Sequence, residues 1–198
     1  MTYNLSSRMD KLPFSEIRIM MEKANEMELA GERVIHLELG RPDFDTPGFI
    51  KDACIESLKR GDVFYTSNYG LLELRQAIAD KLKKENNIIY DTSEILVTTG
   101  LSEAVFDIFS ALLNNGDEIL VPNPVWLNYI HLPNFFGAIP VAYDLFECND
   151  YQIDIELLKS KIIRNTKIII LITPNNPTGG VLSKNVLSEI AKIAIENN

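Results

Sequence analysis

The amino-acid sequence predicts an α/β protein in which helices cover both faces of a mainly parallel sheet, in three αβα layers. From about residue 94 onward, short apolar segments alternate regularly with amphipathic segments. The apolar segments, such as "KIIIL" at 167–171, are apolar at successive positions, as expected of strands buried on both faces. Hydrophobic residues make up 46% of the 198 residues, which is enough for a sizeable core.

The first part of the chain has a less regular pattern. Apolar residues at helical spacing predict a helix over 15–31, and its last residue is a glycine suited to a helix end. Residues 33–39 alternate like a short strand, and 40–48 contain two prolines and two glycines, which predicts a loop. Two further helices are expected over 49–61 and 70–87.

The second part of the chain predicts four strands, each followed by a helix. In parallel sheets of this kind a ligand binds beyond the carboxyl ends of the strands, so the loops that follow the strands are the candidate site. The predicted strands are 94–99, 117–122, 138–143 and 167–174, and the predicted helices are 102–116, 125–137, 153–162 and 183–198.

The loop after the first of these strands could bind an anion. Gly100 permits a tight turn, and Ser102 could cap the helix that follows. The amide N–H groups of Leu101, Ser102 and Glu103 would then face outward at the positive end of the helix dipole, which suits a phosphate. An ordinary strand-to-helix turn is the alternative interpretation.

Two more of these loops carry candidate ligand contacts. Trp126, the only tryptophan, could stack on an aromatic ligand or could simply pack in the core. In "PNNPTGG" (174–180), prolines and glycines restrict the loop, so that Asn176 could present its amide to a ligand or bond locally within the turn. Together, the three loops suit a flat, phosphorylated, heteroaromatic cofactor.

Composition excludes several classes of function. The net charge of −9 without a basic block argues against nucleic acid or an anionic membrane as a partner. We expect no signal peptide and no membrane span, because no apolar run is long enough. Two cysteines with no redox motif suggest a cytoplasmic location, and two distant histidines make a metal site improbable.

Four motifs, in this order and spacing, carry a resemblance to a known family. The sequence resembles the N-terminal half of the class I/II aminotransferases, which have fold type I and use pyridoxal 5′-phosphate (PLP). The resemblance runs from about Glu38 to Asn198. The motifs are "LELGRPDFDTP", "FYTSNYGLLELRQAIA", "VTTGLSEAVFDIFSALLNNGDEILVPNPVWLNY" and "PNNPTGG".

The resemblance implies roles in binding the cofactor. Gly100, Leu101 and Ser102 match the turn that binds the PLP phosphate. Trp126 matches the aromatic residue stacked on the pyridine ring, and Asn176 matches the asparagine that bonds the ring hydroxyl oxygen.

Four residues near the N-terminus also match or depart from the family pattern. Gly40 matches the glycine that lies against the substrate carboxylate. Tyr65 matches the tyrosine that reaches the PLP phosphate of the neighbouring subunit in a homodimer, and Gly70 closes the same motif. Arg41 departs from the pattern, since many relatives carry glutamate there.

The resemblance also implies that essential residues lie beyond the matched segment. The family uses a lysine that forms a Schiff base with PLP, an aspartate at the pyridine nitrogen and an arginine that holds the substrate carboxylate. No residue here matches them, so we assign no catalytic residue. We expect an N-terminal fragment or truncated product that is inactive alone, with residues 1–47 forming the arm and part of a small domain and 48–198 half of the large domain.

The expected parent activity is transfer of an amino group between an amino acid and a 2-oxo acid. Strands from a complementing C-terminal half should lie between the first and last predicted strands of the sheet. A carbon–sulfur lyase or an aminocyclopropane carboxylate synthase would use the same pocket. A non-catalytic partner subunit of a split enzyme is a further alternative.

Overall fold

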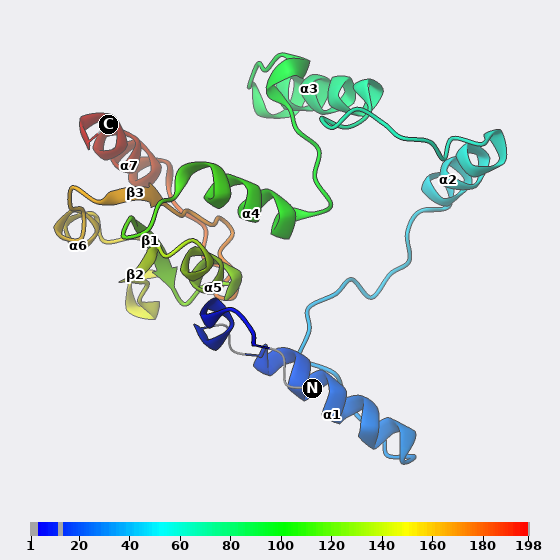
Figure 1. The fold of residues 1–198 in the computed structure, drawn as a ribbon, viewed down its shortest axis with the longest axis horizontal. Helices are drawn as coiled ribbons and strands as arrows, with labels where there is room; N and C mark the ends of the chain where they lie inside the picture. The colour runs from blue at the N-terminus through cyan, green and yellow to red at the C-terminus, as the bar shows by residue number, and fades with distance from the viewer. Residues whose placement is uncertain (1–3, 12–13, 198) are drawn as a thin grey trace. The chain divides into compact units, whose positions relative to one another are not determined.

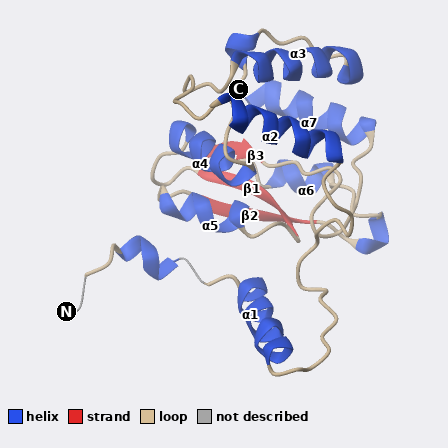
Figure 2. Ribbon diagram, turned by 90° about the vertical axis from the view of Figure 1, so that its right-hand side faces the viewer, coloured by secondary structure: helices blue, strands red, loops and turns tan. Residues whose placement is uncertain are grey.

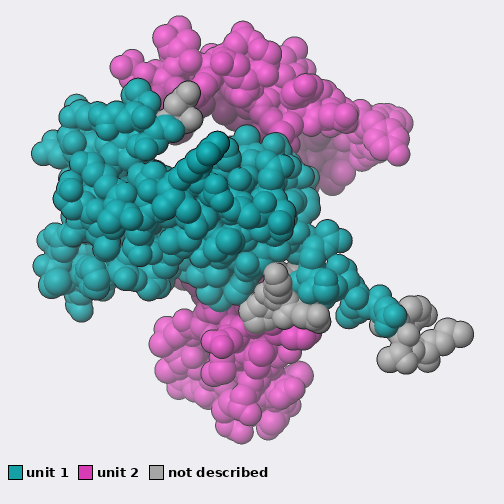
Figure 3. Space-filling model, turned by 60° about the vertical axis from the view of Figure 1, so that its left-hand side comes forward, with its two compact units in different colours: residues 1–12, 99–198 teal, residues 13–98 magenta. Residues whose placement is uncertain are grey.

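The computed structural model describes residues 4–11 and 14–197. The chain divides into two compact units, of which the first comprises residues 1–12 and 99–198 and the second residues 13–98 (Figure 3). The domain boundary expected between residues 47 and 48 remains a prediction.

The first unit is built on a three-stranded parallel sheet. The strands are β1 (Glu118–Asn123), β2 (Ile139–Asp144) and β3 (Thr166–Ile169), in the order β2-β1-β3. Figure 2 shows β1 between its two neighbours (red). Because its backbone is paired on both edges, β1 is the central strand of the sheet.

Helices cover both faces of this sheet, which confirms the predicted αβα architecture (Figure 1). Successive residues of β1 point to opposite faces: Leu120 packs with α6 and α7, whereas Ile119 and Val121 pack with α4 and α5. Each such side chain contributes roughly 1.5–3 kcal/mol when fully buried. The helices of this unit are η1 (Ser7–Lys11), α4 (Leu101–Leu112), α5 (Asn128–Phe135), η3 (Glu147–Asn149), α6 (Ile155–Ser160) and α7 (Lys184–Asn197).

The second unit is helical and has little core of its own. It contains α1 (Glu16–Leu29), α2 (Gly48–Arg60), α3 (Leu72–Asn86) and η2 (Thr92–Glu94). Gly31 and Gly61 follow α1 and α2 with positive φ angles of 89° and 81°, as predicted for glycines at helix ends. Among its described residues, only Ala79 and Ile95 are buried hydrophobics.

Two predicted strands are wrong. Residues 33–39 have no regular secondary structure, and neither do residues 95–98 of the predicted strand 94–99, whose first residue ends η2. A β-strand exists only with a hydrogen-bonded neighbour, and neither segment has a strand partner among the described residues. The last predicted strand is also shorter than expected, ending at Ile169, although the Ile170 N–H still donates to the Leu120 carbonyl at 2.8 Å.

In the part of the chain that the structure describes, no helix combines the length and the apolar character needed to cross a bilayer.

Candidate functional site

A cavity of about 370 Å³ in the first unit is formed by three segments that each follow a sheet strand or open a helix. They are the first turn of α4, the segment joining β1 to α5 and its first turn, and the loop after β3. The cavity is lined by Leu101, Ser102, Trp126, Tyr129, Ile172 and Asn176. Four of the residues predicted to bind a cofactor are therefore brought together around one space.

The first turn of α4 supplies amide donors to this region. Gly100 precedes the helix with φ 79°, and the first intrahelical bond runs from the Ala104 N–H to the Gly100 carbonyl at 3.4 Å. The amides of Leu101, Ser102 and Glu103 precede that bond, at the positive end of the helix dipole. This arrangement favours an anion.

Ser102 has a different local role from the one predicted. It lies inside the first turn and is not the N-cap, which is Gly100, and no side-chain capping bond forms there. The reason is that Gly100 already takes the non-helical conformation required of the cap residue. Ser102 Oγ instead accepts a hydrogen bond from Asn128 Nδ2 at 3.3 Å, which links the first turns of α4 and α5.

Two aromatic rings form a wall of the cavity. The half-buried Trp126 meets Tyr129 edge to face, with ring centroids 5.5 Å apart and an interplanar angle of 81°. Burial raises the pKa of the Tyr129 hydroxyl, so the ring stays neutral. The face of an indole held in this way suits stacking by a planar ligand.

The loop after β3 is braced by Asn175, which is buried. Its backbone N–H donates to the Gly180 carbonyl and its carbonyl accepts from the Gly179 N–H, both at 2.8 Å. Its side-chain Oδ1 accepts from the Thr178 N–H at 3.3 Å and from the Thr178 hydroxyl at 3.1 Å. The neighbouring Asn176 is exposed and lines the cavity. Asn175 therefore bonds locally within the turn, and Asn176 is the residue whose amide can face a ligand.

The donor set fits a flat, phosphorylated, aromatic molecule. Amides at a helix N-terminus and the Ser102 hydroxyl can bind phosphate, the Trp126 ring can stack, and the Asn176 amide can donate to a ring oxygen. The lining contains no lysine, aspartate or arginine. These residues can bind and orient a ligand, but they include no strong nucleophile or base.

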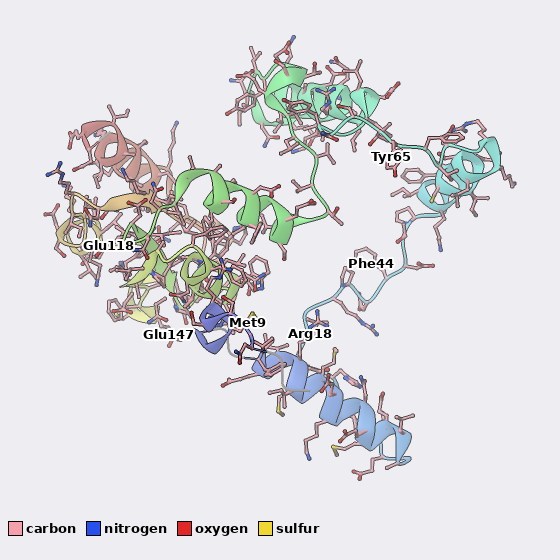
Figure 4. The ribbon with its side chains drawn as sticks, in the orientation of Figure 1. Met9, Arg18, Phe44, Tyr65, Glu118 and Glu147 are labelled. Carbon is pink, nitrogen blue, oxygen red and sulfur yellow. The ribbon has the colours of Figure 1, made fainter. Side chains whose placement is uncertain are left out.

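The two remaining predicted residues, Gly40 and Tyr65, lie in the second unit. The Tyr65 side chain is fully exposed, on the segment between α2 and α3 (Figure 4). A Cβ added at Gly40 would meet no atom within 4 Å. Their predicted roles remain predictions. Among the described residues, no group of three histidine, cysteine or acidic side chains could hold a metal ion.

The sequence interpretation missed Tyr129, Ile172 and the bracing role of Asn175. Tyr129 could have been found, because it follows Trp126 by three residues, the spacing of neighbours on one helix face. Ile172 carried no such signal, since an apolar residue near the end of a buried segment is expected to pack in the core.

Comparison with known proteins gives a consistent result. The family model described as "Aminotransferase class I and II" matches residues 32–198. A probable aspartate/prephenate aminotransferase of Aquifex aeolicus is 42% identical over 196 residues, covering 99% of this chain and 50% of that protein. An aspartate aminotransferase of Bacillus sp. is 40% identical over 194 residues, covering 98% of this chain and 50% of the other.

Solved structures show the same half-length relationship. An alanine aminotransferase from Pyrococcus furiosus superimposes with a TM-score of 0.92 at 40% identity, covering 98% of this chain and 50% of that one. An aspartate aminotransferase from Thermus thermophilus with maleate gives a TM-score of 0.95 at 34% identity, covering 100% and 52%. The chain therefore spans about half the length of the curated relatives it matches.

Proposed function

The chain belongs to the class I and II aminotransferase family, and we propose that it forms the cofactor-holding N-terminal half of an enzyme that transfers an amino group between an amino acid and a 2-oxo acid. One observation carries the proposal: Ser102, Trp126 and Asn176, from three separate segments of the chain, line a single cavity. None of the relatives named above is a carbon–sulfur lyase or an aminocyclopropane carboxylate synthase, so neither alternative is proposed.

The cofactor of the family is PLP, and the residues of the cavity fit it. The first-turn amides of α4 and the Ser102 hydroxyl would hold the phosphate, as Gly100 turns the chain into the helix. Trp126 would lie against the ring, and the Asn176 amide would donate to the ring hydroxyl oxygen. When bound, PLP supplies an electron sink for the substrate carbon.

Gly40 and Tyr65 extend the proposal to the substrate and to a second subunit. The open space at Gly40 leaves its backbone accessible to a substrate carboxylate. The fully exposed Tyr65 is available to reach the phosphate of a partner in a homodimer. The proposal retains residues 1–47 as the arm and part of the small domain and 48–198 as half of the large domain.

The remaining half of the family's length would cover an open edge of the sheet. β3 pairs with β1 on one edge and has no strand partner on the other among the described residues. Beside it lies an apolar groove of about 330 Å³ between β3 and α7, lined among others by Ile169, Leu187 and Ala191. An exposed apolar edge invites pairing with another strand. We assign this surface to a polypeptide carrying the C-terminal half of such an enzyme, in the cytoplasm, where Cys54 and Cys148 stay free.

Complementation tests this function directly. Residues 1–198 are co-expressed with the C-terminal half of the Aquifex aeolicus relative, and transamination is measured with PLP, aspartate and 2-oxoglutarate. Aspartate is the first donor to try, because several relatives are named as aspartate aminotransferases.

We expect turnover only when both halves are present. The C-terminal half alone serves as the control, because it brings the relative's own segment without the cavity described here. A soluble, PLP-loaded complex of the two halves that transfers no amino group from any amino acid would overturn the proposal.

A further inference from the structure

In the second unit, His36 lies between two carboxylates. Its Nε2 is 3.1 Å from Oε1 of Glu28, in the last turn of α1, and its Nδ1 is 2.7 Å from Oε1 of Glu38. Glu38 is the more enclosed of the two acids, with 16% of its side chain exposed against 49% for Glu28. The imidazole therefore bridges the end of a helix and a segment that has no regular secondary structure.

This arrangement favours a doubly protonated ring. An ionised carboxylate only accepts hydrogen bonds, so both ring nitrogens must carry hydrogen for both contacts to be favourable. A neutral imidazole has one N–H and would turn a lone pair toward the other carboxylate. The geometry alone thus favours the imidazolium form.

The charges around the ring support the same state. Its hydrogen bonds to Glu38 and Glu28 raise the pKa of His36 above its ordinary value of 6.5, and His36 in turn lowers the pKa of Glu38. His36 and both glutamates line a polar cavity of about 310 Å³ in the second unit, and Arg41 is the fourth charged residue of that lining. Glu28 is the only acid that α1 contributes to it.

We propose that His36 is a positioning residue that, when protonated, fastens the segment leading to Gly40 and Arg41 onto the last turn of α1 and, when neutral, releases it. The proposal deepens the proposed function, and it depends on that function only for the role of Gly40. No β-ladder holds residues 33–39 among the described residues, and the contact of His36 with Glu28 links this segment to α1.

The pH window follows from the two pKa directions. Because the pKa of His36 is raised on folding, its contribution is complete below about 6.5 and is lost as the pH rises through the raised value. Because the pKa of Glu38 is lowered, its contribution is present above about 4.5 and is lost as the pH falls through the lowered value. The contact is therefore closed in mildly acidic solution and opens toward alkaline pH.

Nuclear magnetic resonance on the full 198-residue chain tests the contact without cofactor or turnover. The chain has only two histidines, so the His131→Gln background leaves His36 as the single imidazole signal. We expect an imidazolium pattern at both nitrogens at pH 6.5 and a midpoint above it. Glu28→Gln and Glu38→Gln should each lower that midpoint, whereas Glu26→Gln, an exposed acid on the same helix, should not.

Hydrogen exchange distinguishes a positioning role from a merely titrating side chain. Amides of residues 33–41 should exchange several-fold faster as His36 loses its proton, while those of α4 keep their rates after correction for intrinsic pH dependence. His36→Gln should give the fast rate at every pH.

Two results would overturn the proposal: a His36 midpoint that neither glutamine variant changes, or exchange in 33–41 that ignores the titration of His36. If the proton-linked change occurs but the complemented enzyme transfers no amino group, the contact stands and the assigned role of Gly40 fails.

Discussion

At the scale of single residues, two adjacent asparagines perform different tasks. Asn175 is buried, and its backbone and side-chain Oδ1 bond to Thr178, Gly179 and Gly180, whereas its Nδ2 has no hydrogen-bond partner among the described residues. Asn176 is left on the open side of the same loop, at the cavity. The bonds of Asn175 hold the loop in one conformation, and so they hold the Asn176 amide in place before a ligand binds. Binding then costs less conformational entropy.

This division predicts the effect of Asn176→Ala on cofactor affinity. A hydrogen bond to a charged group contributes roughly 1.5–3 kcal/mol, so PLP should bind about 10- to 100-fold more weakly. The measurement is quenching of Trp126 fluorescence, which is specific because the chain has one tryptophan. Asn185→Ala, an exposed asparagine of α7 outside the cavity lining, is the matched control. Equal PLP affinity in both variants would show that the Asn176 amide does not contact the cofactor.

At the scale of elements, the local sequence determines helices better than strands in this chain. Helices satisfy their own hydrogen bonds, and glycines mark where α1 and α2 end. The segment before α3 contacts residues 95–98, which form no strand, through a hydrogen bond and one close packing contact. Gly70 has φ 91°, and the Val97 N–H donates to the Tyr69 carbonyl at 3.1 Å. A Cβ at Gly70 would lie 2.7 Å from the Val97 Cβ.

Gly70→Ala should therefore loosen this contact. A residue forced into a positive φ costs about 1–3 kcal/mol, and the Val97 Cβ cannot move without its backbone. We expect the Val97 amide to exchange about tenfold faster or more, as measured by hydrogen exchange. Gly48→Ala is the control, since its added Cβ would meet nothing within 4 Å and its φ is not positive. Identical protection of Val97 in the two variants would show that the Gly70 contact does not order this region.

At the scale of the whole molecule, the sheet of the first unit has an edge and a groove that suit a further strand. β3 is short, and the groove beside it is mainly apolar. The chain corresponds to about half the length of its relatives, and the groove is the surface to which we assign the other half.

Ala191→Arg should block this assembly. Ala191 is exposed on α7 and lines the groove, so the change leaves the core of the unit intact but places a guanidinium where an apolar strand would pack. Burying an unpaired charge costs several kcal/mol, and we expect co-purification with the C-terminal half to fall at least about tenfold. Asn185→Arg, on the same helix outside the groove, should not interfere. If the Ala191→Arg variant assembles as well as the unchanged chain, the groove is not part of the interface with the C-terminal half.

The sequence by itself determined the alternation that forms β1, β2, β3 and the helices α4 to α7. It also predicted that Trp126 and Asn176 belong to one region, because the parallel strands β1 and β3 bring their carboxyl ends to the same edge. These features depend on the local sequence pattern and on a general rule of chain topology, so the sequence is sufficient to predict them. Ser102 joins Trp126 and Asn176 in the cavity although the strand predicted before it, 94–99, does not form.

Only the tertiary structure decided the rest. Residues 33–39 and 94–99 have strand-like sequences yet form no strand, since strand formation depends on a partner that no local pattern supplies. A similar reason applies to the contact of His36 with Glu28, which sequence alone could not assign. The bridge from Glu28 through His36 to Glu38 exists only where the fold brings these groups within about 3 Å.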